Sequence, residues 1–272
     1  MKSYLGSLAA KRLLVVSAVL TAGLTVLLPS WPMPAKPPRA GVEGPRKIPV
    51  GTVLPISLEH ELSSKDKGKD EAIEGRLMQD ILVPGGDPIP AGSKIRGAIT
   101  NIAPASQGEA SITLRFISVQ TRDNTTIPVA VGLRAMAPYL DVQRARTPNQ
   151  ESTGSPGGWA ITLQIGSDVR FGDGGKVTNG HHRIVGQATK NNGVLGRLED
   201  SPGSPCEGWP DATYGPQAVW VFSVDACGIY DMKGVRIARA GNKEPLGEIT
   251  LAKDEGDIKV MKSSAMLLRV VK

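Results

Sequence analysis

The sequence predicts an all-β protein, in which a small β-barrel or β-sandwich domain is followed by a second β-rich domain and preceded by an N-terminal hydrophobic export helix. Two observations predict the β class. Glycine (32) and proline (21) supply about a fifth of the 272 residues, which is typical of a chain with many turns. Apolar and polar residues also alternate with a period of two in many short segments, whereas no segment of comparable length has the helical period.

The first 35 residues have the organisation of an export signal or a membrane anchor. Residues 1–12 carry three basic residues and no acid, residues 13–28 carry no charge, and Pro29 ends the apolar run. As a helix this run would span about 24 Å, which is less than the hydrocarbon core of a membrane. That length favours a cleaved signal over an uncleaved anchor through residues 13–31, and a buried core helix is the least favoured. Both favoured alternatives place the rest of the chain outside the cytoplasm, in the periplasm or secreted.

The net charge of +6 is partly a property of this N-terminal segment. Lys2, Lys11 and Arg12 are three of the 32 basic residues, so the remaining 29 bases face 26 acids and leave +3. Those charges are spread along the chain without a basic stripe, and aromatic residues make up only 4% of the sequence. We therefore expect no nucleic-acid partner.

A proline-rich stretch follows the export segment. Seven prolines stand between residues 29 and 49, with small and basic residues among them. This composition favours the polyproline II conformation and a semi-rigid spacer, which we assign to residues 36–48.

Residues 49–137 are predicted to form the small barrel or sandwich. Residues 52–62 alternate between an apolar and a polar face, and the pattern returns in later segments. A polar turn at 122–125 joins the last two strands as a hairpin, so the sequon at 124–126 is interpreted as turn residues. The predicted strands are residues 52–62, 72–83, 94–102, 111–121 and 126–133.

Residues 138–158 are predicted to be a linker, because they are polar, rich in turn-forming residues and poor in apolar ones. Residues 159–272 then form the second β-rich domain, in which glycine-rich turns separate short strands. No internal repeat relates the two halves. The predicted strands are residues 159–165, 169–171, 183–188, 217–224, 234–238, 246–252, 258–261 and 265–271.

Several short motifs occur in a fixed order in the first half. In that order they resemble a module of uncharacterised exported bacterial proteins and, more distantly, the C-terminal β domain of the TrbI-type scaffold proteins of conjugative type IV secretion channels. Gly51, Gly92 and Gly97 within them suit tight turns or a close approach of strands. The motifs are PVGTVLP at 49–55, LMQDI at 77–81, IPAGSKIRG at 89–97, ASITLRF at 110–116 and NTTIPV at 124–129.

The resemblance covers residues 48–136 and implies a β domain with a scaffold role in the cell envelope. No segment resembles the helical hairpin with which the TrbI-type family forms a pore. Residues 138–272 resemble only the exported group, so the resemblance implies no enzymatic activity.

Cys206 and Cys227 are the two cysteines of the sequence. In an exported chain, two cysteines beside turn-rich segments favour a disulfide, which would close a loop of 22 residues (227 − 206 + 1). In the chain-entropy description, a loop of this length stabilises the fold by about 3 kcal/mol. A pair of free structural thiols is the alternative.

The three histidines do not have the spacing of a metal site. His60 falls on the apolar face of the predicted strand 52–62, where a core or rim histidine is favoured over a ligand. His181 and His182 are adjacent, so on a strand their side chains would point to opposite faces, and a solvated turn is favoured. We expect no metal and no cofactor.

Residues 170–178 (RFGDGGKVT) have a superficial likeness to a phosphate-binding loop. That motif requires glycine where this sequence has Arg170, and serine or threonine where it has Val177. A β-turn is therefore predicted instead. No nucleophile elbow occurs in the sequence, and we assign no catalytic residue.

Acidic residues cluster in three places without the order of a calcium-binding loop. The third cluster, residues 254–257, lies between two alternating segments and is predicted to be the tip of a hairpin. The other two are Asp168 with Asp173, and Glu199 with Asp200.

The aromatic residues are concentrated in the second half. Trp220 and Phe222 are two positions apart in the predicted strand 217–224, so they share a face, and burial in a β core is favoured. An exposed pair would instead indicate a carbohydrate or peptide surface. The others include Trp159, Trp209, Tyr214 and Tyr230.

These features predict an exported cell-envelope protein that acts as a non-enzymatic interaction or scaffold module. The alternative is a glycan- or peptide-binding β domain. An envelope hydrolase ranks last of the three hypotheses, because no set of catalytic residues is visible in the sequence. The expected partners are other envelope proteins, or the membrane through the N-terminal segment.

Overall fold

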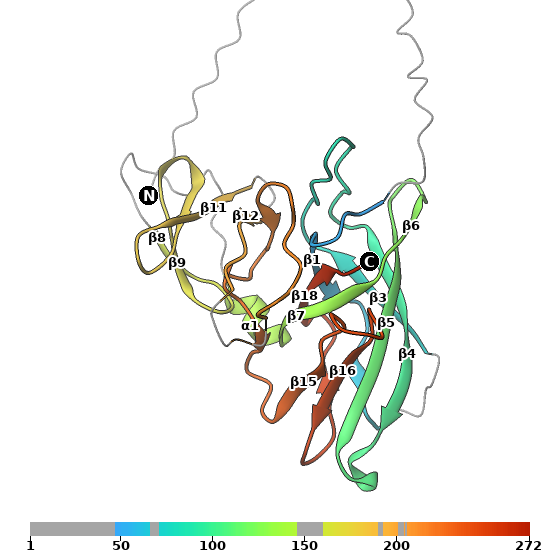
Figure 1. Ribbon diagram of the computed structural model, residues 1–272. Coiled ribbons are helices and arrows are strands. Elements are labelled where there is room, and N and C mark those ends of the chain that lie inside the picture. The colour runs from blue at the N-terminus through green and yellow to red at the C-terminus, as the bar shows by residue number, and fades with distance from the viewer. Residues whose placement is uncertain (1–46, 66–70, 146–159, 190–192, 201–203, 205) are drawn as a thin grey trace, which may run out of the picture. The chain divides into compact units, whose positions relative to one another are not determined.

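Strands account for nearly all of the regular secondary structure, which confirms the predicted β class. The computed structural model describes residues 47–272 apart from 66–70, 146–159, 190–192, 201–203 and 205 (Figure 1). Within these residues the helices are α1 (Tyr139–Arg144) and the short 3₁₀ turns η1 (Ala105–Gln107) and η2 (Asp173–Gly175). No helix in this part of the chain is long and apolar enough to cross a membrane. The predicted export segment, residues 1–35, and the predicted spacer up to residue 46 lie outside the described residues.

Ten strands of the described chain form one sheet that is nearly closed into a barrel (Figure 1). Paired strands are antiparallel, except that β14 runs parallel to β7. The two ends of the sheet meet, because the amide of Leu133 in β7 donates a hydrogen bond of 2.7 Å to the carbonyl of Ala240, directly after β15. In spatial order the strands are β14 (Gly228–Ile229), β7 (Val131–Ala137), β18 (Ala265–Val270), β1 (Val53–Leu58), β3 (Ala72–Leu77), β4 (Lys94–Ala103), β5 (Ala110–Gln120), β16 (Ile249–Lys253) and β15 (Val235–Arg239), with β6 (Thr126–Pro128) beside β5.

Strands from both sides of the predicted linker share this sheet. β18 pairs with β1 on one side and with β7 on the other, and β16 pairs with β5. The chain is therefore not divided between sheets at residues 138–158. The physical reason is that β1 and β7 each present a row of backbone donors and acceptors, which β18 satisfies on both of its edges.

Both faces of the central strands are buried. One face of β1 and β18 contributes to the barrel core, whereas the opposite face packs under the segment around Phe222. Strands buried on both faces carry continuous apolar runs, which explains why β1 and β18 do not alternate cleanly. The inward residues include Leu54, Ile56, Met266 and Leu268, and the outward ones include Val53 and Leu267.

The middle of the chain forms a second antiparallel sheet with its own core. The buried side chain of Gln79, which follows β3 of the barrel, connects the two sheets. Its Nε2 donates a hydrogen bond to the carbonyl of Val194 (3.1 Å), and its Oε1 accepts one from the amide of Trp220 (2.9 Å). A separate pair consists of β2 (Leu62–Ser63) and β17 (Lys259–Val260). The second sheet is β13 (Gln217–Ala218), β12 (Val194–Gly196), β11 (Ile184–Ala188), β10 (Lys176–Thr178), β9 (Asp168–Phe171) and β8 (Ala160–Leu163), in that order.

The predicted strand 217–224 is wrong beyond its first two residues. Only Gln217 and Ala218 form a strand, because Trp220 has a φ of +49° and turns the chain. Phe222 then makes an isolated parallel bridge with Ile165. Trp220 and Phe222 therefore do not share a strand face.

The predicted hairpin tip at residues 254–257 is also wrong. The strand before it, β16, pairs with β5 and β15, whereas the strand after it, β17, pairs with β2. The carboxylate of Asp257 accepts hydrogen bonds of 3.1 Å from the amide of Ala105 and from Ser64 Oγ, which hold the segment away from a hairpin path. The bond from the Ala105 amide is the main reason why the pKa of Asp257 is lowered.

Gly97 is expected to tolerate no side chain. It lies at a bulge between β4 and β5, where a Cβ would stand 2.1 Å from the carbonyl oxygen of Arg115. We expect Gly97→Ala to lower the free energy of unfolding by about 2 kcal/mol, because the two strands must separate. Urea unfolding measures the change. Gly86→Ala is the control, since a Cβ there would meet nothing within 4 Å, and an equal effect of both substitutions would contradict the prediction.

Candidate functional site

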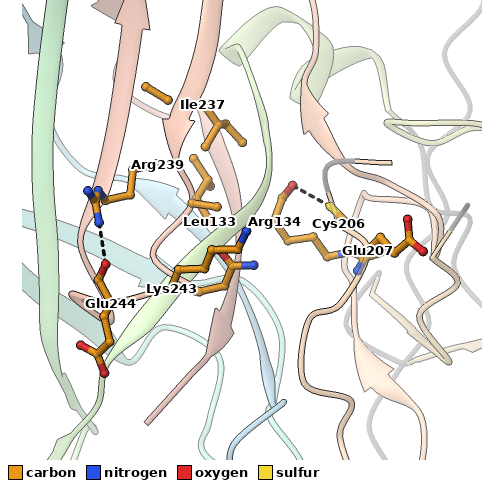
Figure 2. Close-up of a pocket in the computed structure, with 11 residues that line it drawn as sticks. Leu133, Arg134, Cys206, Glu207, Ile237, Arg239, Lys243 and Glu244 are labelled. Carbon is orange, nitrogen blue, oxygen red and sulfur yellow. Dashed lines mark hydrogen bonds between the residues drawn. The ribbon is translucent and has the colours of Figure 1, made fainter. Parts of the chain in front are cut away.

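A pocket of about 480 Å³ opens beside the loop that carries Cys206 (Figure 2). Arg134 and Cys206 line one side of it, and Arg239, Lys243 and Glu244 line the other. Arg239 Nη1 donates a hydrogen bond of 2.9 Å to the carbonyl of Glu244, and its Nε lies 3.6 Å from a carboxylate oxygen of Glu248. Arg239 is thus held by protein atoms, so its side of the pocket is shaped by structural contacts.

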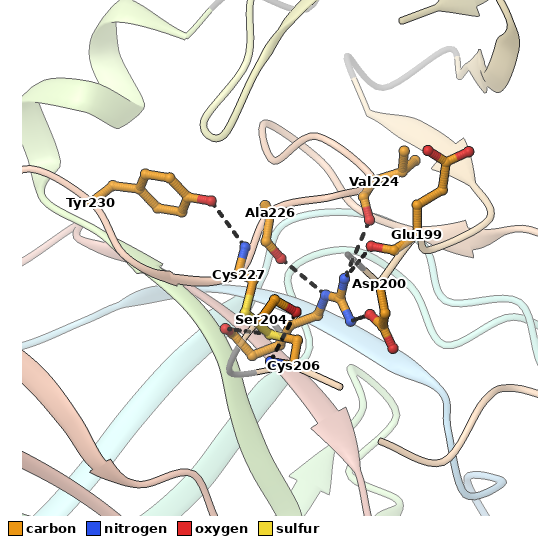
Figure 3. The surroundings of a disulfide bond; sticks show 9 residues. Glu199, Asp200, Ser204, Cys206, Val224, Ala226, Cys227 and Tyr230 are labelled. Carbon is orange, nitrogen blue, oxygen red and sulfur yellow. Dashed lines mark hydrogen bonds and ion pairs between the residues drawn. A yellow bond between two sulfur atoms is a disulfide. The ribbon is translucent and has the colours of Figure 1, made fainter. Parts of the chain in front are cut away.

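Cys206 and Cys227 are joined, as the sequence predicts, with their sulfur atoms 2.11 Å apart (Figure 3). Cys206 is buried, and its Sγ lies 3.5 Å from the carbonyl oxygen of Arg134. On the other side, the amide of Cys227 donates a hydrogen bond of 2.9 Å to the hydroxyl of Tyr230. The disulfide therefore fastens two loop segments onto the outer face of β7.

Arg134 is a buried, hydrogen-bonded side chain that the sequence analysis did not single out. The pairing of β7 with β18 shifts between Leu267 and Leu268, which leaves Arg134 as an extra residue of a β-bulge. Its side chain is 0% exposed and projects into the loop segments beside the disulfide. A basic residue in an alternating strand is typical of a solvent-facing position, so no signal in the sequence could have revealed this burial.

The guanidinium of Arg134 is bound on all sides by the covering segments (Figure 3). Its Nε donates to the carbonyl of Ala226 (3.0 Å), and Nη2 donates to those of Glu199 (3.0 Å) and Val224 (3.4 Å). Nη1 pairs with the carboxylate of Asp200 at 2.5 Å. The predicted acidic cluster of Glu199 and Asp200 therefore binds Arg134, through the carbonyl of Glu199 and the carboxylate of Asp200, and does not form a separate site.

The predicted histidines and the glycine-rich loop are brought to no common site. β1 ends at Leu58, so His60 lies beyond the strand and is exposed, which corrects its predicted place on the apolar face. His181 and His182 lie exposed in the turn between β10 and β11, as predicted. Residues 170–178 comprise the end of β9, the turn at 172–175 and the whole of β10, so the predicted turn is confirmed for its centre. Across the described residues, no three histidine, cysteine, aspartate or glutamate side chains are placed to hold a metal ion.

Three aspartates line a pocket of about 320 Å³ beside α1. Asp141 lies in the first turn of α1 and Asp231 follows β14, and the predicted acid Asp168 also lines the pocket. Burial raises the pKa of Asp141, and the neighbouring Asp231 raises it further, against the lowering effect of Arg144. Asp141 Oδ2 is buried and has no hydrogen-bond partner among the described residues.

Asp141→Asn is expected to stabilise the protein at neutral pH. The pKa of Asp141 is higher in the folded protein than in the unfolded chain, so folding favours the protonated carboxyl. The stability that this carboxyl contributes is fully present at a pH below its unfolded pKa, and it is lost as the pH rises through its folded pKa. The amide cannot ionise, and we expect a gain of about 1 kcal/mol at pH 7 over wild type. Urea unfolding at pH 4 and pH 7 measures it. A difference between the two proteins that is the same at both pH values would contradict the prediction.

An open groove of about 610 Å³ lies where β5 passes from one partner strand to another. Residues 110–114 of β5 pair with β16 and residues 118–120 pair with β6, and the groove is lined by the residues between them. Its floor is apolar, with buried Phe116 and Val129. Ile117 lines it with a 58% exposed side chain, and the other apolar lining residues are Ile48, Pro128, Ala130, Pro245 and Leu246.

The rim of this groove is mainly basic. Lys47, Arg115 and Lys272 line it, against one carboxylate, Glu244. Arg115 Nη2 lies 3.7 Å from Glu248, whereas its Nε is buried without a hydrogen-bond partner in the described part of the chain. The groove thus combines exposed apolar surface with positive charge.

The favoured burial of Trp220 and Phe222 is confirmed for Phe222 and only partly for Trp220. Phe222 is fully buried and Trp220 is partly buried against the same cluster, so the pair does not present an exposed platform. Trp209 is buried as well, and Trp159 lies outside the described residues.

No family model matches the chain, and no curated protein matches it either.

Proposed function

We propose that the protein is an exported, non-enzymatic interaction module of the cell envelope, which binds an extended and acidic segment of a partner protein in the groove beside β5. The observation that carries the proposal is the combination of apolar lining with three basic groups at the rim of the groove. An extended segment buries alternate apolar side chains and presents its carboxylates to such a rim. The disulfide supports the extracytoplasmic location, because structural disulfides persist in oxidising compartments.

The architecture supports a binding role for the groove. Both of its walls belong to the barrel, since β5 pairs with β4 along its length and the loop of Pro245 and Leu246 leads into β16. A groove on paired strands keeps its shape when the partner binds, which limits the loss of conformational entropy. The scaffold role and the TrbI-type resemblance fit the same proposal, with the groove as the point of attachment.

A peptide library tests the proposal. Random peptides displayed on phage are selected on the full-length protein in mild detergent, and enriched peptides are synthesised for fluorescence-polarisation titration. We expect the enriched peptides to combine apolar residues with acids. Ile117→Asp and Arg115→Glu are each expected to weaken their binding about tenfold or more.

The control is Ile184→Asp, which changes an equally exposed isoleucine (64%) in β11, away from the groove. That variant is expected to bind the peptides as the wild type does. Selection of no peptide, or of basic peptides, would contradict the proposal, as would equal weakening by the groove variants and the control.

A further inference from the structure

Residues 209–214, here called the strap, cross three neighbouring strands of the barrel. The indole of Trp209 packs on Gly132 of β7, where a Cβ would lie 2.6 Å from the ring. Asp211 Oδ1 then accepts a hydrogen bond of 2.6 Å from Arg269 Nη2 on β18. The strap therefore lies over the outer face of both strands.

The far end of the strap is attached beside β1. A Cβ on Gly51 would lie 2.5 Å from the backbone nitrogen of Ala212, and the hydroxyl groups of Tyr214 and Thr52 are 2.5 Å apart. The strap is thus fixed at both ends, and Arg269 lies beneath it.

Three hydrogen-bond donors beneath the strap have no acceptor in the described part of the chain. The side chain of Arg269 is 1% exposed, and its Nε and Nη1 have no partner among the described residues. Trp209 is 5% exposed, and its Nε1 also has no partner there. Because Arg269 pairs with Gly132, on which Trp209 packs, the two side chains are neighbours on one face of the sheet. Buried donors in folded proteins are almost always satisfied, so these three require an acceptor.

The charge beneath the strap is also poorly balanced. The carboxylate that pairs with Arg269, Asp211, is 83% exposed and therefore screened by water. Burial is the main cause that lowers the pKa of Arg269, and the second buried guanidinium, that of Arg134, lowers it further, whereas Asp211 and the charge of Asp200 raise it. A negative charge beside Arg269 would offset both effects.

We propose that a small inorganic anion, either chloride or an oxyanion such as sulfate or phosphate, binds beneath the strap to Arg269 Nε, Arg269 Nη1 and Trp209 Nε1. An anion only accepts hydrogen bonds, which matches a site that offers three donors. Since both side chains are buried, we limit the proposal to a small ion. This anion is a structural component of the cover over β7 and β18, and the proposal is independent of the groove.

Anion release from the purified protein tests this site. Full-length protein in mild detergent is desalted into MES buffer and denatured, and the released anions are identified by ion chromatography. We expect about one equivalent of chloride, sulfate or phosphate per wild-type chain, since the buried donors require an acceptor. Trp209→Phe keeps an aromatic ring and removes Nε1–H, so it is expected to hold the anion about tenfold more weakly.

Trp220→Phe is the matched control and is expected to retain the anion. If Trp209→Phe does not fold, the wild type provides the test, because its thermal midpoint is expected to rise saturably with the released anion at constant ionic strength. Release of no anion from folded wild-type protein would overturn the proposal in favour of buried water. Equal release from Trp209→Phe and from the wild type would show an adventitious ion only and would also overturn it.

Discussion

Replacing Arg134 with methionine is expected to lower the free energy of unfolding by about 3–5 kcal/mol, the largest effect of any single substitution considered. The methionine fills part of the space but donates no hydrogen bond. It leaves the carboxylate of Asp200 without its cation and three carbonyl groups of the covering segments without their donor. Urea unfolding followed by tryptophan fluorescence measures the loss.

The control for Arg134 is Arg96→Met. Arg96 is 48% exposed and lies 3.3 Å from Glu74, so its ion pair is screened by water. We expect this substitution to change the free energy of unfolding by less than about 1 kcal/mol. Equal effects of Arg96→Met and Arg134→Met would show that the buried network contributes nothing beyond a surface pair.

Loss of the disulfide is expected to have the second-largest effect. The double variant Cys206→Ser and Cys227→Ser frees a loop of 22 residues (a separation of 21 positions plus 1), and we expect it to lose about 3 kcal/mol of unfolding free energy. Hydrogen exchange is expected to show where the loss begins, with earlier exchange in the strap than in β4 and β5. Reductant should destabilise the wild type and leave the double variant unchanged. A double variant that unfolds at the same urea concentration as the oxidised wild type would contradict this prediction.

The strands of the barrel could be predicted because alternation and short apolar runs are both local patterns. Residues 94–102, 111–121 and 265–271 coincide closely with β4, β5 and β18, and the predicted hairpin is confirmed by the pairing of β5 with β6. The pairing of β18 between β1 and β7 could not be predicted, because alternation shows which side chains face a core but not which strand is the neighbour. This is why two domains were expected where strands of both halves share one sheet.

The errors in side-chain placement have local causes. The alternation before His60 continues past the point where β1 ends, so His60 is exposed instead of lying on the apolar face. Trp220 adopts a positive φ that non-glycine residues rarely take, which no pattern in the sequence indicates. Arg134 is buried because segments about 65 and 90 positions later cover it, at a range that local patterns do not reach.

The position of β18 delays folding until the end of the described chain has been made. Val53 in β1 pairs with Arg269 in β18, which is 216 positions later (269 − 53). Until residues 265–270 are available, β1 and β7 each keep an open edge, and the barrel cannot close. A product that stopped before Ala265 would keep both edges open to pairing with other chains.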